Sequence, residues 1–322
     1  MTRVAGIDCG TNSIRLLVAD VHPETGELIE LDRRMTIVRL GQGVDRTGRL
    51  APEALERTFA ACRAYAAVIE ELGAERLRFV ATSASRDAEN RDEFVRGVVD
   101  ILGVEPEVIS GDQEAEFSFT GATAELEKEG AGAESLPRKG GGGRRAGEKY
   151  LVVDIGGGST EFVVGNKQVE AARSVDIGCV RLTERHVRHD PVSAEEAAAI
   201  RTDIRAALDL AEETVPLESA ETLVGLAGSV TTVAAIALDL PEYDSTKIHR
   251  AVIPYEQVVA VTERLLASTH DERAAIPVMH PGRVDVIVAG ALVLREIMER
   301  TGARQVVVSE HDILDGIALS VA

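Results

Sequence analysis

Three consecutive glycines, Gly156, Gly157 and Gly158, follow closely after Asp154. Glycine has no Cβ, so successive backbone N–H groups can turn toward one point and bind a phosphate oxygen without a charged side chain. An ionised Asp154 cannot donate to phosphate, but it can bind a Mg²⁺ ion that bridges to phosphate. A plain hairpin turn needs one or two glycines rather than three, so the pattern predicts a phosphate loop. Its predicted contacts are Gly156, Gly157, Gly158, Ser159 and Thr160.

The same arrangement occurs earlier, because Asp-x-Gly-x-x-Ser begins at Asp8 as well as at Asp154. Each copy separates two apolar stretches, which predicts a β-hairpin with the motif at its turn. Two copies indicate two related domains, and we expect the hairpins to face one cleft. Asn12 by itself is also an ordinary turn residue. The phosphate contacts predicted for the first hairpin are Thr11, Asn12, Ser13 and, on the same strand face as Ser13, Arg15.

Two more reactive side chains lie just past predicted strands. Arg86 follows the apolar stretch Leu77–Ala81, and Glu114 follows Glu107–Ile109. Ligands of open α/β sheets bind beyond the carboxyl ends of the strands, where Arg86 would offer a fork-shaped donor to phosphate. The alternatives are a surface arginine that opens a helix and an acid that complements a helix dipole.

The apolar periodicity predicts an α/β protein. A Gly-rich segment at about 128–148 interrupts it and is predicted to be a disordered loop. The remaining predicted strands are Val4–Ile7, Ile14–Val18, Glu27–Leu40, Tyr150–Val153, Glu161–Val164, Thr222–Leu226 and Gln305–Val308. The predicted helices are Pro52–Leu72, Asn90–Leu102, Ala194–Glu213 and Arg283–Arg300, with others beginning after Gly111 and at Ser229, Glu256 and Asp312.

Composition limits the classes of protein and partner. The 322 residues are 45% hydrophobic but only 3% aromatic, so Ala, Val, Leu and Ile must fill the interior. A formal charge of −19 disfavours binding to nucleic acid or anionic membranes, and a polyanionic substrate would need arginines or a metal to screen it. The three cysteines are scattered, and no apolar stretch approaches the roughly 18 residues of a membrane span. We therefore expect a cytoplasmic protein.

Six segments in order, DCGTNSIRL, VATSASRDA, VISGDQEAEF, DIGGGSTE, GLAGSVTT and GRVDVIVAGA, resemble the exopolyphosphatase/guanosine pentaphosphate phosphohydrolase family. The resemblance covers nearly the whole chain. It implies the two-domain fold of actin, Hsp70 and sugar kinases, with ribonuclease H-like halves and an interdomain cleft. Domain I would comprise residues 1–122 plus about 302–322, and domain II residues 123–301.

The resemblance also assigns roles. It implies that Glu114 is the catalytic base that primes water, and that Arg15 and Arg86 bind phosphate. Acids at Asp154 and Glu161, with Asp8 as a further candidate, would hold Mg²⁺ or Mn²⁺. Nearby phosphates would raise the pKa of Glu114 and a helix start would lower it, so the sequence gives no net direction. The third loop of the family corresponds to Gly228 and Ser229.

The implied reaction releases terminal phosphate from inorganic polyphosphate. We expect short chains to be preferred, because the sequence stops at Ala322 without the C-terminal helical region of many relatives. Guanosine pentaphosphate is the nearest alternative substrate, and a catalytically weak polyphosphate- or alarmone-binding protein is another reading. A sugar kinase or chaperone is disfavoured by the few glycines of GLAGSVTT, and Leu314 stands where relatives often carry arginine. A homodimer is inferred from relatives alone.

Overall fold

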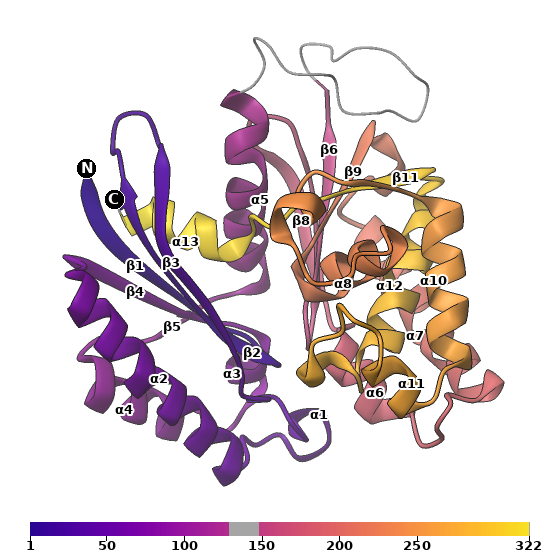
Figure 1. Cartoon of the computed structure of the whole chain (residues 1–322), viewed down its shortest axis with the longest axis horizontal. Helices are drawn as coiled ribbons and strands as arrows, with labels where there is room; N and C mark the ends of the chain where they lie inside the picture. The colour runs from indigo at the N-terminus through magenta and orange to yellow at the C-terminus, as the bar shows by residue number, and fades with distance from the viewer. Residues whose placement is uncertain (129–147, 322) are drawn as a thin grey trace. The chain divides into compact units, whose positions relative to one another are not determined.

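The computed structural model describes residues 1–128 and 148–321, so most of the predicted loop at 128–148 lies outside the described residues. The chain divides into two α/β units (Figure 1). Unit 1 contains Met1–Ala124 and Asp312–Ala322, and unit 2 contains Glu125–His311. The expected return to domain I near residue 302 is wrong. Strand β11 (Gln305–Val308) pairs within the sheet of unit 2, so unit 1 resumes only at Asp312.

The sheet of unit 1 has the strand order β3-β2-β1-β4-β5. Strand β1 is central, antiparallel to β2 and parallel to β4, and the outer pairs continue these two directions. The register places Asp8 opposite Arg15 across the first hairpin. The five strands are β1 (Thr2–Cys9), β2 (Ser13–Val21), β3 (Leu28–Ile37), β4 (Arg76–Ala81) and β5 (Glu107–Val108).

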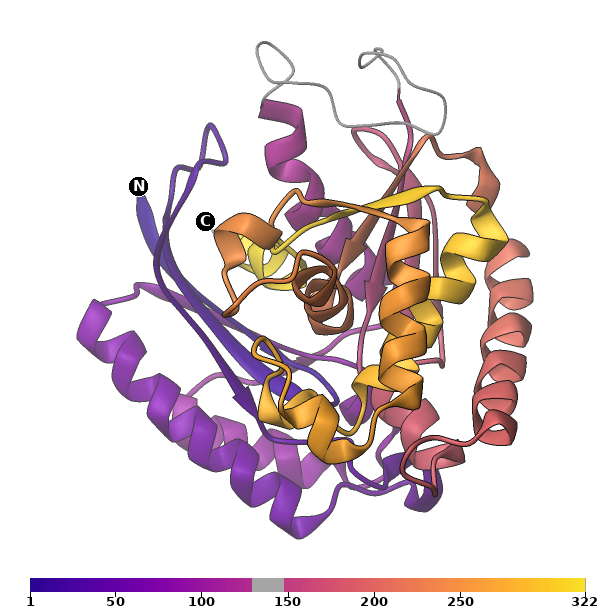
Figure 2. The same cartoon turned by 45° about the vertical axis from the view of Figure 1, so that its right-hand side comes forward.

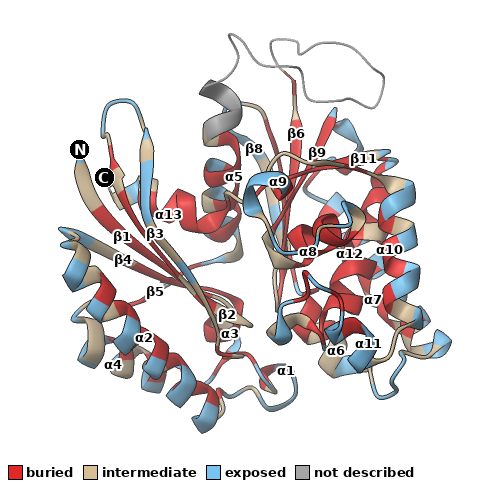
Figure 3. Ribbon diagram, viewed as in Figure 1, coloured by how far each residue is buried: buried red, intermediate tan, exposed pale blue. Residues whose placement is uncertain are grey.

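Helices cover both faces of this sheet (Figure 1). One face packs on α2 (Pro52–Leu72) and α4 (Arg91–Leu102), and the other on α5 (Gly111–Lys128) and α13 (Ile313–Val321). Figure 3 shows the resulting pattern, with buried residues on the inner sides of α2 and α4 and exposed residues outside. The helix α2 has the predicted bounds because Pro52 suits a first helical position and the following Gly73 adopts the left-handed conformation. Two short helices are α1 (Val44–Thr47) and α3 (Ser83–Asp87).

The sheet of unit 2 repeats this architecture. Its order is β10-β11-β9-β6-β7-β8. Apart from β10, the series β8-β7-β6-β9-β11 matches the series β3-β2-β1-β4-β5 of unit 1 in both order and direction. The repeat confirms the two-unit α/β fold class that the duplicated motif predicts. The other strands are β6 (Tyr150–Ile155), β7 (Thr160–Gly165), β8 (Val169–Val175), β9 (Thr222–Leu226) and β10 (Val252–Pro254).

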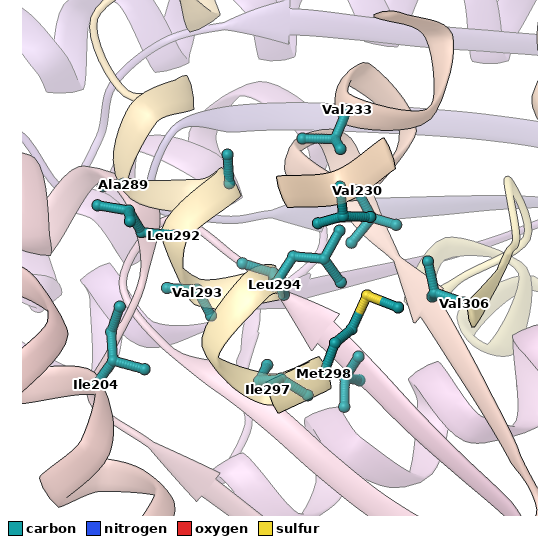
Figure 4. Close-up of a cluster of buried hydrophobic side chains, with 14 of the residues drawn as sticks. Ile204, Val230, Val233, Ala289, Leu292, Val293, Leu294, Ile297, Met298 and Val306 are labelled. Carbon is teal, nitrogen blue, oxygen red and sulfur yellow. The ribbon is translucent and has the colours of Figure 1, made fainter. Parts of the chain in front are cut away.

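The core of unit 2 surrounds α12 (Ile287–Thr301), whose residues are buried on nearly every side. It packs against α7 (Ala194–Glu212), α8 (Ala227–Ala237) and α10 (Tyr255–Ala267), which are drawn in Figure 2. Figure 4 shows side chains of α7 and α8 beside those of α12. The predicted start of α12 at Arg283 is wrong, because Pro281–Arg283 forms a separate 3₁₀ turn. No helix in residues 1–128 and 148–321 is both long enough and apolar enough to cross a membrane. The remaining helices are α6 (Cys179–His186), α9 (Ser245–Ile248), α11 (His270–Ala274) and the 3₁₀ turn Leu217–Ser219.

Candidate active site

The glycine loop joins β6 to β7, as predicted, and the first turn of α6 supports it from behind. Cys179 N–H donates to the Gly156 carbonyl at 3.0 Å. The Gly157 carbonyl accepts from Val180 N at 2.9 Å and Arg181 N at 3.1 Å. The Gly158 carbonyl accepts from Arg181 Nε at 2.7 Å. Three consecutive carbonyls of the loop are therefore all bonded on the side of α6.

This backing determines where the loop N–H groups point. In a planar trans peptide the C=O and N–H point in opposite directions. The N–H groups of Gly157, Gly158 and Ser159 therefore point away from α6, and none of the three has a hydrogen-bond partner among the described residues. Such a row of convergent donors is an anion-binding nest. Thr160 is placed differently from expectation, because its buried hydroxyl donates to the Ile177 carbonyl at 2.6 Å.

The start of α6 packs tightly against the glycine loop, with no room for a side chain at Gly178. Gly178 precedes α6, and a Cβ built there would lie 2.5 Å from Gly158 N and closer still to the carbonyl of Gly157. Only glycine allows the helix to approach the loop this closely. Any other residue at position 178 would therefore displace either the loop or the start of α6.

Two acids lie on the strands that flank the loop. Asp154 on β6 is directly opposite Glu161 on β7, and both are buried, at 7% and 1% exposure. Directly opposed side chains share one face of a sheet, where like charges repel. A divalent cation would relieve this repulsion, and Mg²⁺ is commonly held by one or two carboxylates together with water and phosphate. The pair therefore fits Mg²⁺, although no group of three or more His, Cys, Asp or Glu in the described parts of the chain is arranged as a metal site.

The third loop connects β9 to α8. Ala227 has a positive φ of 65°, which is unfavourable for a residue with a Cβ. Arg283 holds the loop, since its Nη1 donates at 2.8 Å to both the Gly228 carbonyl and Thr232 Oγ1. Ser229 is buried, and its hydroxyl hydrogen-bonds the Cys179 side chain. Burial is the larger influence on Cys179 and raises the pKa of its thiol, so Cys179 is held as a neutral group.

The first loop, in unit 1, is supported from behind in a similar way. Its Thr11 carbonyl accepts from Gly41 N at 2.9 Å, and its Asn12 carbonyl accepts from the N–H groups of Val38 and Arg39. Thr11 Oγ1 and Asn12 Oδ1 are buried, and neither has a hydrogen-bond partner in the described part of the chain. Buried polar atoms are normally paired, so these two atoms are candidates for contact with a ligand.

Arg15 is bound by two carboxylates of unit 1. Its Nη2 lies 2.6 Å from Asp8 Oδ2, and its Nη1 forms an ion pair with Asp312. Burial is the main influence on Asp8 and raises its pKa, against the opposing effect of Arg15. The guanidinium predicted to bind phosphate is thus already partly neutralised, and its role as a phosphate ligand stays a prediction.

Arg86 and Glu114 are brought together. Arg86 Nη1 donates to Glu114 Oε2 at 2.6 Å and to the Ile109 carbonyl at 3.0 Å. Glu114 is 8% exposed. Burial raises the pKa of Glu114, and nearby Asp8 raises it further, while Arg86 and a hydrogen bond from Thr82 lower it. A carboxylate with a raised pKa is better suited to act as a general base near neutral pH.

Sequence reasoning missed the residues that support the loops. Arg181 and Gly178 lie beyond a strand, β8, that the sequence did not predict, because its charged and small residues show no clear alternation. Asp312 is 297 positions from its partner Arg15, a separation at which a single sequence carries no pairing signal. Arg283 was predicted to be the first residue of a helix, so its contact with the third loop was not expected.

Known proteins resemble this chain over nearly its whole length. The model of the Ppx/GppA phosphatase family matches residues 17–133 and 143–322. A protein named Exopolyphosphatase 2 from Mycobacterium tuberculosis is 50% identical over 333 aligned residues, which cover 100% of this chain and 99% of the relative. A crystal structure of an exopolyphosphatase-like protein superposes with a TM-score of 0.90 at 43% identity, covering 99% of this chain and 97% of that one. The Aquifex aeolicus PPX-GPPA enzyme gives a TM-score of 0.78 at 30% identity, with 99% of each chain covered. The chain belongs to the Ppx/GppA phosphatase family.

Proposed function

We propose that the protein is an exopolyphosphatase, which hydrolyses the terminal phosphoanhydride bond of inorganic polyphosphate. Family membership and the name of the M. tuberculosis relative support the reaction. The observation that carries the proposal is the row of N–H groups at Gly157, Gly158 and Ser159, which point away from their support and have no partner among the described residues. A phosphate oxygen matches such donors in both charge and geometry.

Phosphoryl transfer asks the protein mainly to position the reactants and to stabilise charge. In the proposal, the glycine loop holds phosphate oxygens. Glu114 is proposed to orient the attacking water and to take up its proton. Arg86 fixes the carboxylate of Glu114 through one nitrogen, and its remaining N–H groups are proposed to bind phosphate. Arg15 is also proposed to bind phosphate.

The proposed cofactor is Mg²⁺ or Mn²⁺. Asp154 and Glu161 would hold the ion, with Asp8 as a further candidate, and it would neutralise charge on the phosphate oxygens. The buried carboxylate pair supports this assignment, because two like charges on one face of a hairpin favour a bound cation.

One assay tests the function. Phosphate release is measured from polyphosphates of defined length and from guanosine pentaphosphate, each with and without Mg²⁺. Glu114→Gln should lower kcat by about 10²–10⁴-fold, the usual contribution of a general base. The matched control is Glu116→Gln, because Glu116 is exposed on the same helix and should leave kcat unchanged.

Each alternative has its own outcome in this assay. Near-normal kcat in Glu114→Gln would refute the assignment of the base. Phosphate release from guanosine pentaphosphate but not from polyphosphate would show that guanosine pentaphosphate is the substrate. Tight binding of tripolyphosphate without release of phosphate would show that the protein binds polyphosphate and does not hydrolyse it.

The cellular setting also belongs to the proposal. All three cysteines are buried free thiols, which supports a cytoplasmic location. The charge of −19 supports neither nucleic acid nor anionic membranes as partners. A homodimer is proposed by analogy with relatives, and light scattering at micromolar concentration tests it.

A further inference from the structure

We propose that Arg181 is a positioning residue, which holds one peptide group of the glycine loop so that the Ser159 N–H faces phosphate. The inference rests on the proposed function, since it assigns a task to the loop that binds the substrate. It concerns a side chain that does not touch the substrate. Its action passes through the carbonyl of Gly158.

The helix itself supports only part of the loop. Its first amides, from Cys179 to Arg181, bond the carbonyls of Gly156 and Gly157. The next carbonyl, that of Gly158, receives no amide of α6. It is bonded instead by the Arg181 side chain, whose Nε lies 2.7 Å away. The side chain therefore extends the backing of the loop by one residue.

This one bond decides the direction of a donor. The Gly158 carbonyl and the Ser159 N–H belong to the same planar peptide, so fixing the first fixes the second. Glycine permits a wide range of backbone angles, so without the tether this peptide can rotate. Rotation would replace a donor by a carbonyl oxygen on the phosphate side of the loop, and an oxygen repels an anion. Arg181 is proposed to prevent this.

The position of Arg181 suits a tether better than a phosphate ligand. Its side chain is only 12% exposed and points to the support side of the loop. The carboxylate of Asp176 is 4.0 Å from Nη2 and largely exposed, so this contact is weak. The Nε of Arg181 donates to the backbone of the loop.

The chemistry of the side chains separates a tether from a mere charge. Glutamine places its amide nitrogen as many bonds from Cα as arginine places Nε, so Arg181→Gln keeps a donor without a charge. Arg181→Met has a methyl group at that position, and Arg181→Lys keeps the charge but carries its donor one bond farther out. Arg264→Met is the control for loss of a charge, because Arg264 is exposed on α10 of the same unit.

The experiment measures two quantities for each variant. Isothermal titration gives the affinity for inorganic phosphate in the presence of Mg²⁺, and initial rates on tripolyphosphate give kcat and KM. Arg181→Met and Arg181→Lys should lose about 10–100-fold in kcat/KM, somewhat less than complete removal of an oxyanion donor. Arg181→Gln should stay within about threefold of wild type, because only the charge assistance of the bond is lost. Thermal midpoints are recorded to exclude unfolding.

Two results would overturn the inference. One is an Arg181→Met variant with wild-type phosphate affinity and kcat/KM. The other is activity that follows charge, with Arg181→Lys active and Arg181→Gln as poor as methionine. If wild type releases no phosphate from polyphosphate, the proposed function fails. The ranking of variants in phosphate affinity still tests the tether in that case.

Discussion

Gly178 offers a direct way to displace the phosphate loop. In Gly178→Ala the new Cβ would lie 2.5 Å from Gly158 N, whereas carbon–nitrogen contacts are comfortable at about 3.5 Å. Because the neighbouring atoms are backbone, the loop or the start of α6 must move by about 1 Å. A misplacement of about 1 Å in a positioning group can cost about 10²-fold in rate. We therefore expect kcat/KM to fall by about that factor.

The assay is phosphate release from tripolyphosphate, with the free energy of unfolding measured in urea. Gly302→Ala is the matched control in the same unit. Gly302 has a φ of 62° and no atom within 4 Å of its built Cβ, so alanine should cost about 1 kcal/mol of stability without moving the loop. Equal kcat/KM for Gly178→Ala and wild type would refute the tight approach of α6 to the loop. Equal losses in the two variants would attribute the effect to stability instead.

Two more predictions concern unit 1. Burial raises the pKa of Glu114, so this carboxylate should become protonated at a higher pH than an ordinary glutamate, whose pKa is about 4.3. As the pH is lowered, kcat/KM should therefore begin to fall above that value. Thr82→Val removes a hydrogen bond that lowers this pKa, so it should move the acid limb of the pH–rate profile to higher pH, and a shift to lower pH would contradict the assignment. Asp315→Asn breaks a 2.7 Å ion pair with Arg33 and should cost about 2–3 kcal/mol in urea unfolding, since Asp315 is 3% exposed and Arg33 is 28% exposed. The exposed pair formed by Asp32 is the control, and Asp32→Asn should cost less than about 1 kcal/mol. Equal costs would show that burial does not govern these pairs.

Local patterns in the sequence predicted the elements that carry strong local signals. Pro52 and Gly73 mark the two ends of α2, and apolar stretches on both sides of each Asp-x-Gly motif placed both hairpins. The glycine loop could be assigned to a turn because three glycines have few other uses. These signals depend only on neighbours in the chain.

The support of the site could not be predicted in the same way. Arg181 bonds Gly158 across 23 positions and Asp312 bonds Arg15 across 297, and neither pairing leaves a local pattern. The start of α6 carries no side-chain cap, because Gly178 occupies that position for reasons of space. The direction of the Glu114 pKa also needed the structure, since only burial shows which influence is larger.

The discontinuity of unit 1 has a consequence for biosynthesis. Strands β1 and β2 are synthesised before unit 2, but the apolar face that they present through Val4 and Leu17 is covered by Leu314 and Ala318, which are synthesised after it. A nascent chain must therefore keep this face out of aggregates while all of unit 2 is made. The same segment contains Asp312, so Arg15 gains this ion pair only after unit 2 has been synthesised. Incomplete polypeptides would lack both the cover and the anchor.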